Sequence, residues 1–262
     1  MYPIWNPIFK SIKVFLMLNL DNNRDFPYYN ENPKMSKIGW LVLLICIPVA
    51  YYANGFVSVF SNEIIGSISF LLILLIPLLY FSNWDYSLFF QKPTKNELIL
   101  AVLMCLAYIV YSSILTNLLG TWGIPDVGNS NANIVTIVSL IFSMMAEELI
   151  KFIPLMFLLR VLFKYTSNRR LSIIVSSIFT LIFFGLIHLE PSTTILSVLV
   201  IQGAGSIFHL YVYLKTKNLF ASYLSHLMTD ASVLILVMMG LIGWTFKNIF
   251  LHNQHIDWWW TY

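Results

Sequence analysis

Long apolar runs separated by short polar segments fill this chain from about residue 38 to residue 244. Each run is close to the ~20 residues that a helix needs to cross the hydrocarbon core of a bilayer. The runs are continuous and do not alternate with period two, which excludes the strands of a porin-type barrel. We therefore predict an all-α membrane protein, a polytopic bundle of about seven transmembrane helices. The predicted spans are residues 38–60, 64–83, 97–121, 133–160, 171–189, 195–214 and 219–244.

The rest of the chain flanks this bundle. Residues 1–37 are partly amphipathic and partly polar, and we expect them to form a cytoplasmic N-terminal segment. Residues 38–245 form the predicted transmembrane helical domain. Residues 246–262 form a predicted extracytoplasmic tail, whose tryptophans suit an interfacial anchor. The sequence contains no internal repeat and no linker long enough to separate domains.

Composition agrees with a membrane protein, since 58% of the residues are hydrophobic and 10% are charged. A soluble domain carries about 25% charged residues. Cys46 and Cys105 lie inside apolar runs and provide neither a disulfide framework nor a metal-binding spacing. The lipid bilayer is therefore an expected partner, and no nucleic acid is expected.

The basic residues predict the orientation of the spans. Cytoplasmic loops of membrane proteins carry an excess of lysine and arginine. With seven alternating crossings, thirteen of the fifteen basic residues fall on one side. We therefore expect a multi-pass protein of the cell membrane with a cytoplasmic N-terminus and an external C-terminus. The thirteen are Lys10, Lys13, Arg24, Lys34, Lys37, Lys92, Lys95, Arg160, Lys164, Arg169, Arg170, Lys215 and Lys217.

A few ionisable residues lie within the predicted spans. An ionised side chain near the bilayer centre costs roughly 2.5–3.5 kcal/mol on insertion scales, so such residues face the bundle interior or a watery cavity. The fourth span carries most of them, and the fifth, sixth and seventh spans carry the others. They are Glu147, Glu148, Lys151, His188, His209, His226 and Asp230.

The spacing of these residues predicts how they face one another. Glu147 and Lys151 are four residues apart, so they share a helix face and can pair. Glu148 points about 100° away from Glu147. His226 and Asp230 are also four apart. The fourth, fifth and seventh spans must therefore cluster to satisfy these groups.

The sixth span supplies small residues and one isolated histidine. Gly203–Gly205 would let a neighbouring helix approach closely. His209 has no motif around it, and we expect a structural or supporting role. At ~1.5 Å per residue, the drawn spans separate His188 and His226 by roughly 10–15 Å in depth. Helix tilt or a deep-set turn at 215–218 would close this gap.

The available chemistry favours an activated water. The sequence has no Gly-x-Ser-x-Gly motif and no cysteine near a histidine. Glu147 could act as the general base, with His188 holding the same water. His226 and Asp230 could orient or stabilise the oxyanion that forms on a scissile carbonyl. Glu147, His188 and His226 could alternatively bind Zn²⁺, which takes histidine and carboxylate ligands.

Three short motifs follow one another on successive apolar segments. They are Glu147-Glu148, Phe184-x-x-x-His188 and His226-x-x-x-Asp230. Together they resemble the CPBP intramembrane proteases, the CAAX prenyl endopeptidase and bacteriocin-processing (Abi) family, over about residues 130–245. The resemblance implies that Glu147 and His188 activate water while His226 and Asp230 assist at the oxyanion. We expect supporting roles for Phe184, Lys151 and Glu148, with Glu148 acting through a neighbouring helix or Lys151, and we favour a mechanism that requires no metal.

Two positions depart from the family pattern. Phe152 stands where the first motif has arginine, and Lys151 is the nearest cation. The resulting Glu-Glu-x-x-Lys resembles the related PrsW-like proteases. Asp230 stands where the third motif usually has asparagine. Because an ionised aspartate only accepts hydrogen bonds, Asp230 must be protonated, orient His226 or bind a metal if the site works.

We therefore expect an intramembrane endopeptidase that cleaves a membrane-associated or peptide substrate. The departures at Phe152 and Asp230 keep an alternative open, a catalytically silent member that acts as a membrane adaptor or bacteriocin-immunity protein. An ion-coupled carrier would need an internal repeat, and the sequence shows none.

Overall fold

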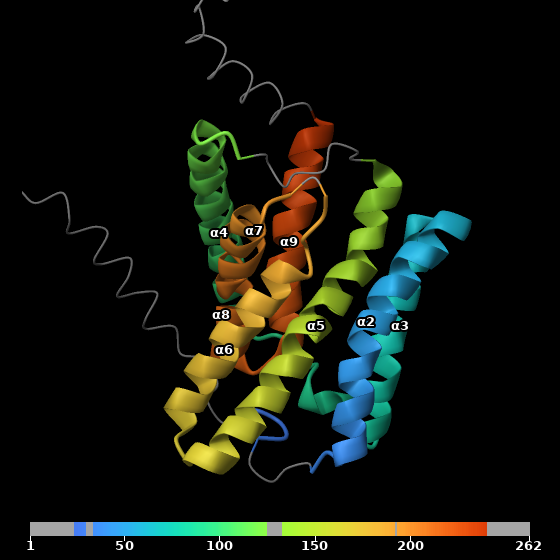
Figure 1. Cartoon of the computed structure of the whole chain (residues 1–262), viewed down its shortest axis with the longest axis vertical. Coiled ribbons are helices and arrows are strands. Elements are labelled where there is room, and N and C mark those ends of the chain that lie inside the picture. The colour runs from blue at the N-terminus through green and yellow to red at the C-terminus, as the bar shows by residue number, and fades with distance from the viewer. Residues whose placement is uncertain (1–23, 30–33, 125–132, 192, 240–262) are drawn as a thin grey trace, which may run out of the picture.

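The computed structural model describes residues 24–29, 34–124, 133–191 and 193–239. Residues 1–23 of the predicted N-terminal segment and the whole predicted tail lie outside these ranges. The described residues form a bundle of helices and contain no strand (Figure 1). The helices are α2 (Lys37–Phe60), α3 (Glu63–Phe81), η1 (Tyr86–Leu88), α4 (Lys95–Thr121), α5 (Ile134–Thr166), α6 (Arg169–Leu186), α7 (Ile195–Ser197), η2 (Val198–Ala204), α8 (Ile207–Thr216) and α9 (Leu219–Met238).

This architecture confirms the predicted fold class, an all-α polytopic membrane protein. Six of the described helical segments are long and apolar enough to cross a membrane, with Ile195–Thr216 counted as one segment. Helix α5 is the longest described helix at 33 residues, but it is not among the six. Glu147, Glu148 and Lys151 interrupt its apolar run. Three of the ionisable residues within the predicted spans therefore lie in the middle of the longest described helix.

Polar capping residues decide where the long helices begin. The side chains of Ser36, Asn62, Thr94, Asn133 and Asn168 each accept a hydrogen bond from a backbone N–H in the first turn of the following helix. Such caps satisfy donors that have no partner within the helix. They start α4 and α6 two residues before the predicted spans, because hydrophobicity alone does not register a cap.

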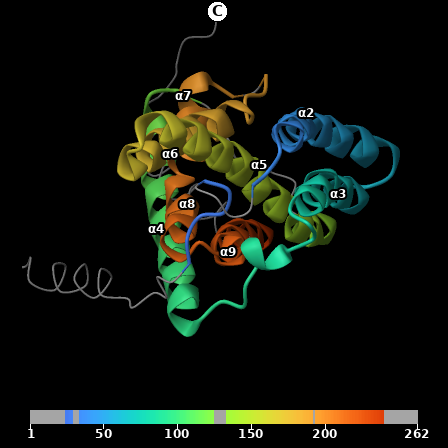
Figure 2. The same ribbon diagram turned by 90° about the horizontal axis from the view of Figure 1, so that it is seen from below.

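Helix α5 runs through the middle of the bundle. In Figure 1 it crosses between the α2–α3 pair and the helices α4, α6, α8 and α9. Figure 2, from below, shows the same separation. It packs against α3, α6 and α9. The residues of α5 therefore face helices that lie far away in the sequence.

The predicted sixth span is one membrane-crossing segment built from three helical pieces, with the π-helix η2 between α7 and α8. The expectation of a close helix approach is correct at Gly203. A Cβ atom there would lie 2.8 Å from the Leu181 carbonyl oxygen of α6, and one at Gly185 would lie 2.9 Å from the Val198 carbonyl oxygen. Because Gly185 directly follows Phe184, this contact fixes the end of α6 that carries the second motif.

The turn before α9 is buried inside the protein. The Asn218 side chain donates to the Gln91 carbonyl oxygen at 3.0 Å, and the Leu219 N–H donates to the Phe89 carbonyl oxygen at 2.8 Å. Asn218 and Leu219 are 0% and 1% exposed. Helix α9 therefore begins within the bundle, not at its rim. The third motif lies deeper in the bundle than the predicted span 219–244 implied.

Candidate functional site

The four predicted catalytic side chains converge on one place, where α5 and α9 meet the turn that follows α6. Glu147 Oε2 lies 3.9 Å from His188 Nε2 and 3.8 Å from His226 Nε2. Asp230 Oδ2 lies 3.8 Å from the same His226 Nε2. The predicted spans, at ~1.5 Å per residue, separated His188 and His226 by roughly 10–15 Å in depth. The short distances to Glu147 show that this separation is wrong. The buried turn at Asn218 accounts for the difference, because it lets His226 reach the level of Glu147.

The two glutamates of the first motif lie in different surroundings. The Glu147 side chain is 19% exposed and the His188 side chain 23% exposed, whereas Glu148 and Lys151 are each 2% exposed. Asp230, at 34%, lies on the accessible side as well. A substrate or a water can therefore reach Glu147 and His188, while Glu148 and Lys151 form the buried support behind them.

Lys151 forms its ion pair with Glu148, not with Glu147, although the spacing allowed both pairings. Residues three and four apart are both neighbours on a helix surface, and the packing of α5 decides between them. Glu148 faces the buried side with Lys151, whereas Glu147 faces His188. The lysine ammonium also lies over the Phe184 ring, 4.6 Å from its centroid.

His226 stands between the two glutamates. Its Nδ1 lies 2.9 Å from Glu148 Oε1, and its Nε2 faces Glu147 Oε2. A ring nitrogen and a carboxylate oxygen at 2.9 Å require a proton between them, so Nδ1–H donates to Glu148. The Ser222 hydroxyl lies 2.6 Å from Glu148 Oε2 and 2.8 Å from the His209 carbonyl oxygen, and it can donate its single proton to either acceptor.

Phe184 explains the four-residue spacing of the second motif. Its carbonyl oxygen accepts the hydrogen bond from His188 Nδ1 at 2.7 Å. Its ring lies edge-on to His188 at 4.6 Å and to His226 at 6.4 Å. Phe184 thus holds the tautomer of one histidine and packs against both.

Phe152, which stands at the family's arginine position, belongs to an aromatic core. It is 2% exposed, and its ring lies 5.4 Å from the Phe89 ring and 5.6 Å from the Tyr213 ring. The cation that neutralises Glu148 therefore comes from Lys151, one position earlier. The departure moves the positive charge along α5 without removing it from the site.

Sequence reasoning missed Ser222 as a member of the site. Ser222 is four residues before His226, so it lies on the same face of α9, and this spacing could have identified it. His209 was expected to be structural or supporting, and the structure places it directly against His226, with ring centroids 4.6 Å apart.

The geometry does not fit a metal ligand set. Carboxylate and imidazole groups are of the type that Zn²⁺ accepts. Among the described residues, however, no group of three His, Cys, Asp or Glu side chains is arranged to hold a metal ion. That the reaction requires no metal stays a prediction.

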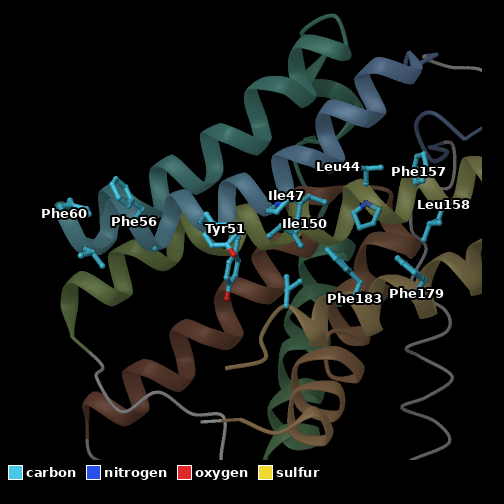
Figure 3. A pocket seen from close by; sticks show the side chains of 16 residues that line it. Leu44, Ile47, Tyr51, Phe56, Phe60, Ile150, Phe157, Leu158, Phe179 and Phe183 are labelled. Carbon is cyan, nitrogen blue, oxygen red and sulfur yellow. The ribbon is translucent and has the colours of Figure 1, made fainter. Parts of the chain in front are cut away.

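An apolar groove runs alongside the site between α2, α5 and α6 (Figure 3). Its volume is about 1030 Å³. Ile150, Phe183 and Ile187 line it, and each directly precedes a site residue in the sequence. Tyr51 of α2 lines the groove as well. The groove is therefore lined by sequence neighbours of Lys151 on α5, of Phe184 on α6 and of His188 just beyond α6.

Fold and site together define a polytopic membrane protein with a carboxylate–imidazole cluster among its helices. A family model described as type II CAAX prenyl endopeptidase Rce1-like matches residues 129–232, which is less than half of the chain. This match confirms the resemblance to the CPBP intramembrane proteases over the segment that carries all three motifs. No curated protein and no solved structure matches the chain. The likeness of the first motif to PrsW-like proteases is not confirmed and stays a prediction.

Proposed function

We propose that this protein is an intramembrane endopeptidase in which Glu147 and His188 activate the water that hydrolyses a peptide bond. One observation carries the proposal. The Nε2 atoms of His188 and His226 lie 3.9 and 3.8 Å from Glu147 Oε2, on the accessible side of a buried ionic support. The match to a protease family supports the reaction class.

The geometry suits a water shared by Glu147 and His188. Separations of 3.8–3.9 Å are too long for direct hydrogen bonds, and a polar contact of this length can be bridged by water. His188 donates through Nδ1 to Phe184, so Nε2 of the neutral ring accepts. Glu147 takes a proton from the water while the water oxygen attacks the scissile carbonyl carbon. The same proton then passes to the leaving amine when the C–N bond breaks.

His226 is placed to stabilise the oxyanion. Because its Nδ1 proton is donated to Glu148, Nε2 donates only when the ring is an imidazolium. Glu148 lies at Nδ1, and Glu147 with Asp230 lie near Nε2. The imidazolium can then donate to the developing oxyanion. Asp230 fits the orienting role among the three that the sequence left open.

The groove suggests where a membrane-associated substrate lies. Its wall is apolar and includes Ile150 and Ile187, which precede Lys151 and His188 in the sequence. An apolar chain or segment in the groove would bring an attached peptide to Glu147 without leaving the bilayer. The substrate class we propose is therefore a peptide or membrane protein with an apolar anchor.

The test is cleavage of a fluorescence-quenched prenylated CAAX peptide by the full chain in liposomes. Glu147→Gln keeps the shape of the side chain and removes its basicity, so kcat should fall by about 10²–10⁴-fold. Glu190→Gln is the matched control, because Glu190 is exposed and lies two residues after His188. Wild-type kcat in a folded E147Q protein would contradict the proposal.

Two residues support an alternative, a silent family member that acts as a membrane adaptor or bacteriocin-immunity protein. Phe152 occupies the arginine position, and Asp230 lacks the donor that asparagine would supply. This alternative predicts that Glu147→Ala leaves the cellular phenotype intact. Endopeptidase function predicts that the same change abolishes it.

A further inference from the structure

His209 lies against the face of His226, although it belongs to none of the three motifs. The two imidazoles are stacked, with centroids 4.6 Å apart and planes 21° apart. His209 is 1% exposed. It comes from α8, whereas His226 comes from α9, so the stack joins two helices directly behind the proposed oxyanion site.

Neighbouring groups fix the His209 ring. Its Nδ1 lies 3.0 Å from the Ser225 hydroxyl oxygen. The Tyr108 ring of α4 lies 5.1 Å from it, with the planes 35° apart. Gly205 makes room for that tyrosine, because a Cβ atom at this position would lie 2.7 Å from Tyr108 Cε2. Three helices therefore hold one imidazole in place.

The surroundings favour a neutral His209. Its Nε2 has no hydrogen-bond partner among the described residues, and a buried charge without a partner is strongly unfavourable. Lys151 already places a cation 3.4 Å from His226 Nδ1. A second cation stacked on His226 would oppose the imidazolium that the mechanism needs, whereas a neutral aromatic face accommodates it.

We propose that His209 is a positioning residue that holds the plane of the His226 ring. The torsion that rotates an imidazole about its Cβ–Cγ bond is broad, so the bond from Nδ1 to Glu148 leaves the ring free to tilt. The stacked face of His209 removes that freedom and keeps Nε2 directed at Glu147 and Asp230. Its catalytic consequence rests on the proposed function; the positioning itself does not.

The first arm of the test needs no substrate. Nitrogen NMR of the ¹⁵N-histidine-labelled full chain in detergent reports the protonation and mobility of each imidazole, and a His226→Gln sample identifies the His226 signals. We expect one sharp pair of His226 signals in the wild type and in His209→Phe, which keeps a flat ring. His209→Leu should broaden or shift them, with Ser225→Ala between the two. Unchanged His226 signals in His209→Leu would overturn the proposal.

The second arm measures cleavage of the prenylated CAAX peptide. His209→Leu should lower kcat by roughly 10- to 100-fold with KM unchanged, as expected from a misplaced catalytic group. His209→Phe should recover most of that loss at equal thermal stability. A folded His209→Leu protein with wild-type kcat, or a His209→Phe protein as slow as His209→Leu, would contradict positioning by the ring face. If the wild type cleaves nothing, the proposed function fails, while the NMR arm still decides the role of His209.

Discussion

At the scale of single residues, the two adjacent glutamates have separate tasks. Glu148 is enclosed by Lys151, Ser222 and His226, so its charge is neutralised inside the protein. Glu147 lies near His188 and His226 on the accessible side. Burial therefore distinguishes a carboxylate that supports the fold from an accessible one, which we propose is the reactive carboxylate, at adjacent positions of the same helix.

Removal of Lys151 should destabilise the protein. Lys151→Met leaves Glu148 buried without its cation, which typically costs about 3–5 kcal/mol. The double variant Glu148→Gln with Lys151→Met should recover much of the loss, because it leaves no unpaired charge. Reversible unfolding in detergent measures both. Equal stability of wild type and Lys151→Met would show that the ion pair does not support the fold.

Most members of the candidate site could be predicted from the sequence, but their exact contacts could not. Ionisable residues in apolar runs and their four-residue spacings indicated Glu147, His188 and His226. The choice of Lys151 between Glu147 and Glu148 depends on which side of α5 is covered by α9. That side is set by packing between distant segments. The spacing of residues within one helix does not show which face a distant helix covers.

At the scale of helices, the predicted sixth span differs from the structure in its internal hydrogen bonding. Hydrophobicity predicts a single crossing at 195–214, and the structure divides it into α7, η2 and α8. Tyr111 of α4 donates to the Val200 carbonyl oxygen at 2.8 Å, so the π-helical segment is tied to a neighbour. The hydrophobic pattern of the sequence does not reveal hydrogen bonds of this kind, so it does not predict the π-helical segment.

The groove beside α2 gives an element-scale prediction. A Cβ atom at Gly55 would meet no described atom within 4 Å, and the same holds for Gly120 on α4, away from the groove. Gly55→Leu should therefore fill the groove without disturbing the fold, and raise KM for the prenylated peptide by roughly tenfold, consistent with the loss of apolar contacts.

Gly120→Leu is the matched control for that prediction. It adds the same side chain to an exposed helical glycine, so it should leave KM unchanged. Identical KM values for the two variants would show that the substrate does not use the groove.

At the scale of the whole molecule, the other helices pack around α5, and α6 and α9 bring their site residues to it. The number and type of helices followed from run length because a bilayer demands long apolar helices. The approach of His188 and His226 to the same Glu147 oxygen did not follow, because a buried turn and a segmented span change helix depth. Sequence therefore predicted the fold class and the site's members more closely than the site's geometry.

Orientation in the membrane is a prediction that labelling can test. In a background with Cys46 and Cys105 replaced by serine, Ser61→Cys and Ser167→Cys place single thiols in exposed turns at the ends of α2 and α5. The distribution of basic residues predicts that a membrane-impermeant maleimide labels position 61 in intact cells. Position 167 should react only after permeabilisation, and the reverse pattern would invert the topology.

The central claim is that Glu147 and His188 act on the same water, and a kinetic cycle tests it most directly. Cleavage of the prenylated CAAX peptide is measured for wild type, Glu147→Gln, His188→Ala and the double variant, all of equal thermal stability. Residues that act as a unit show strongly non-additive losses. The double variant should therefore be no more than about tenfold slower than the slower single variant. Losses that multiply, or single variants that cleave at the wild-type rate, would contradict a shared water at this site.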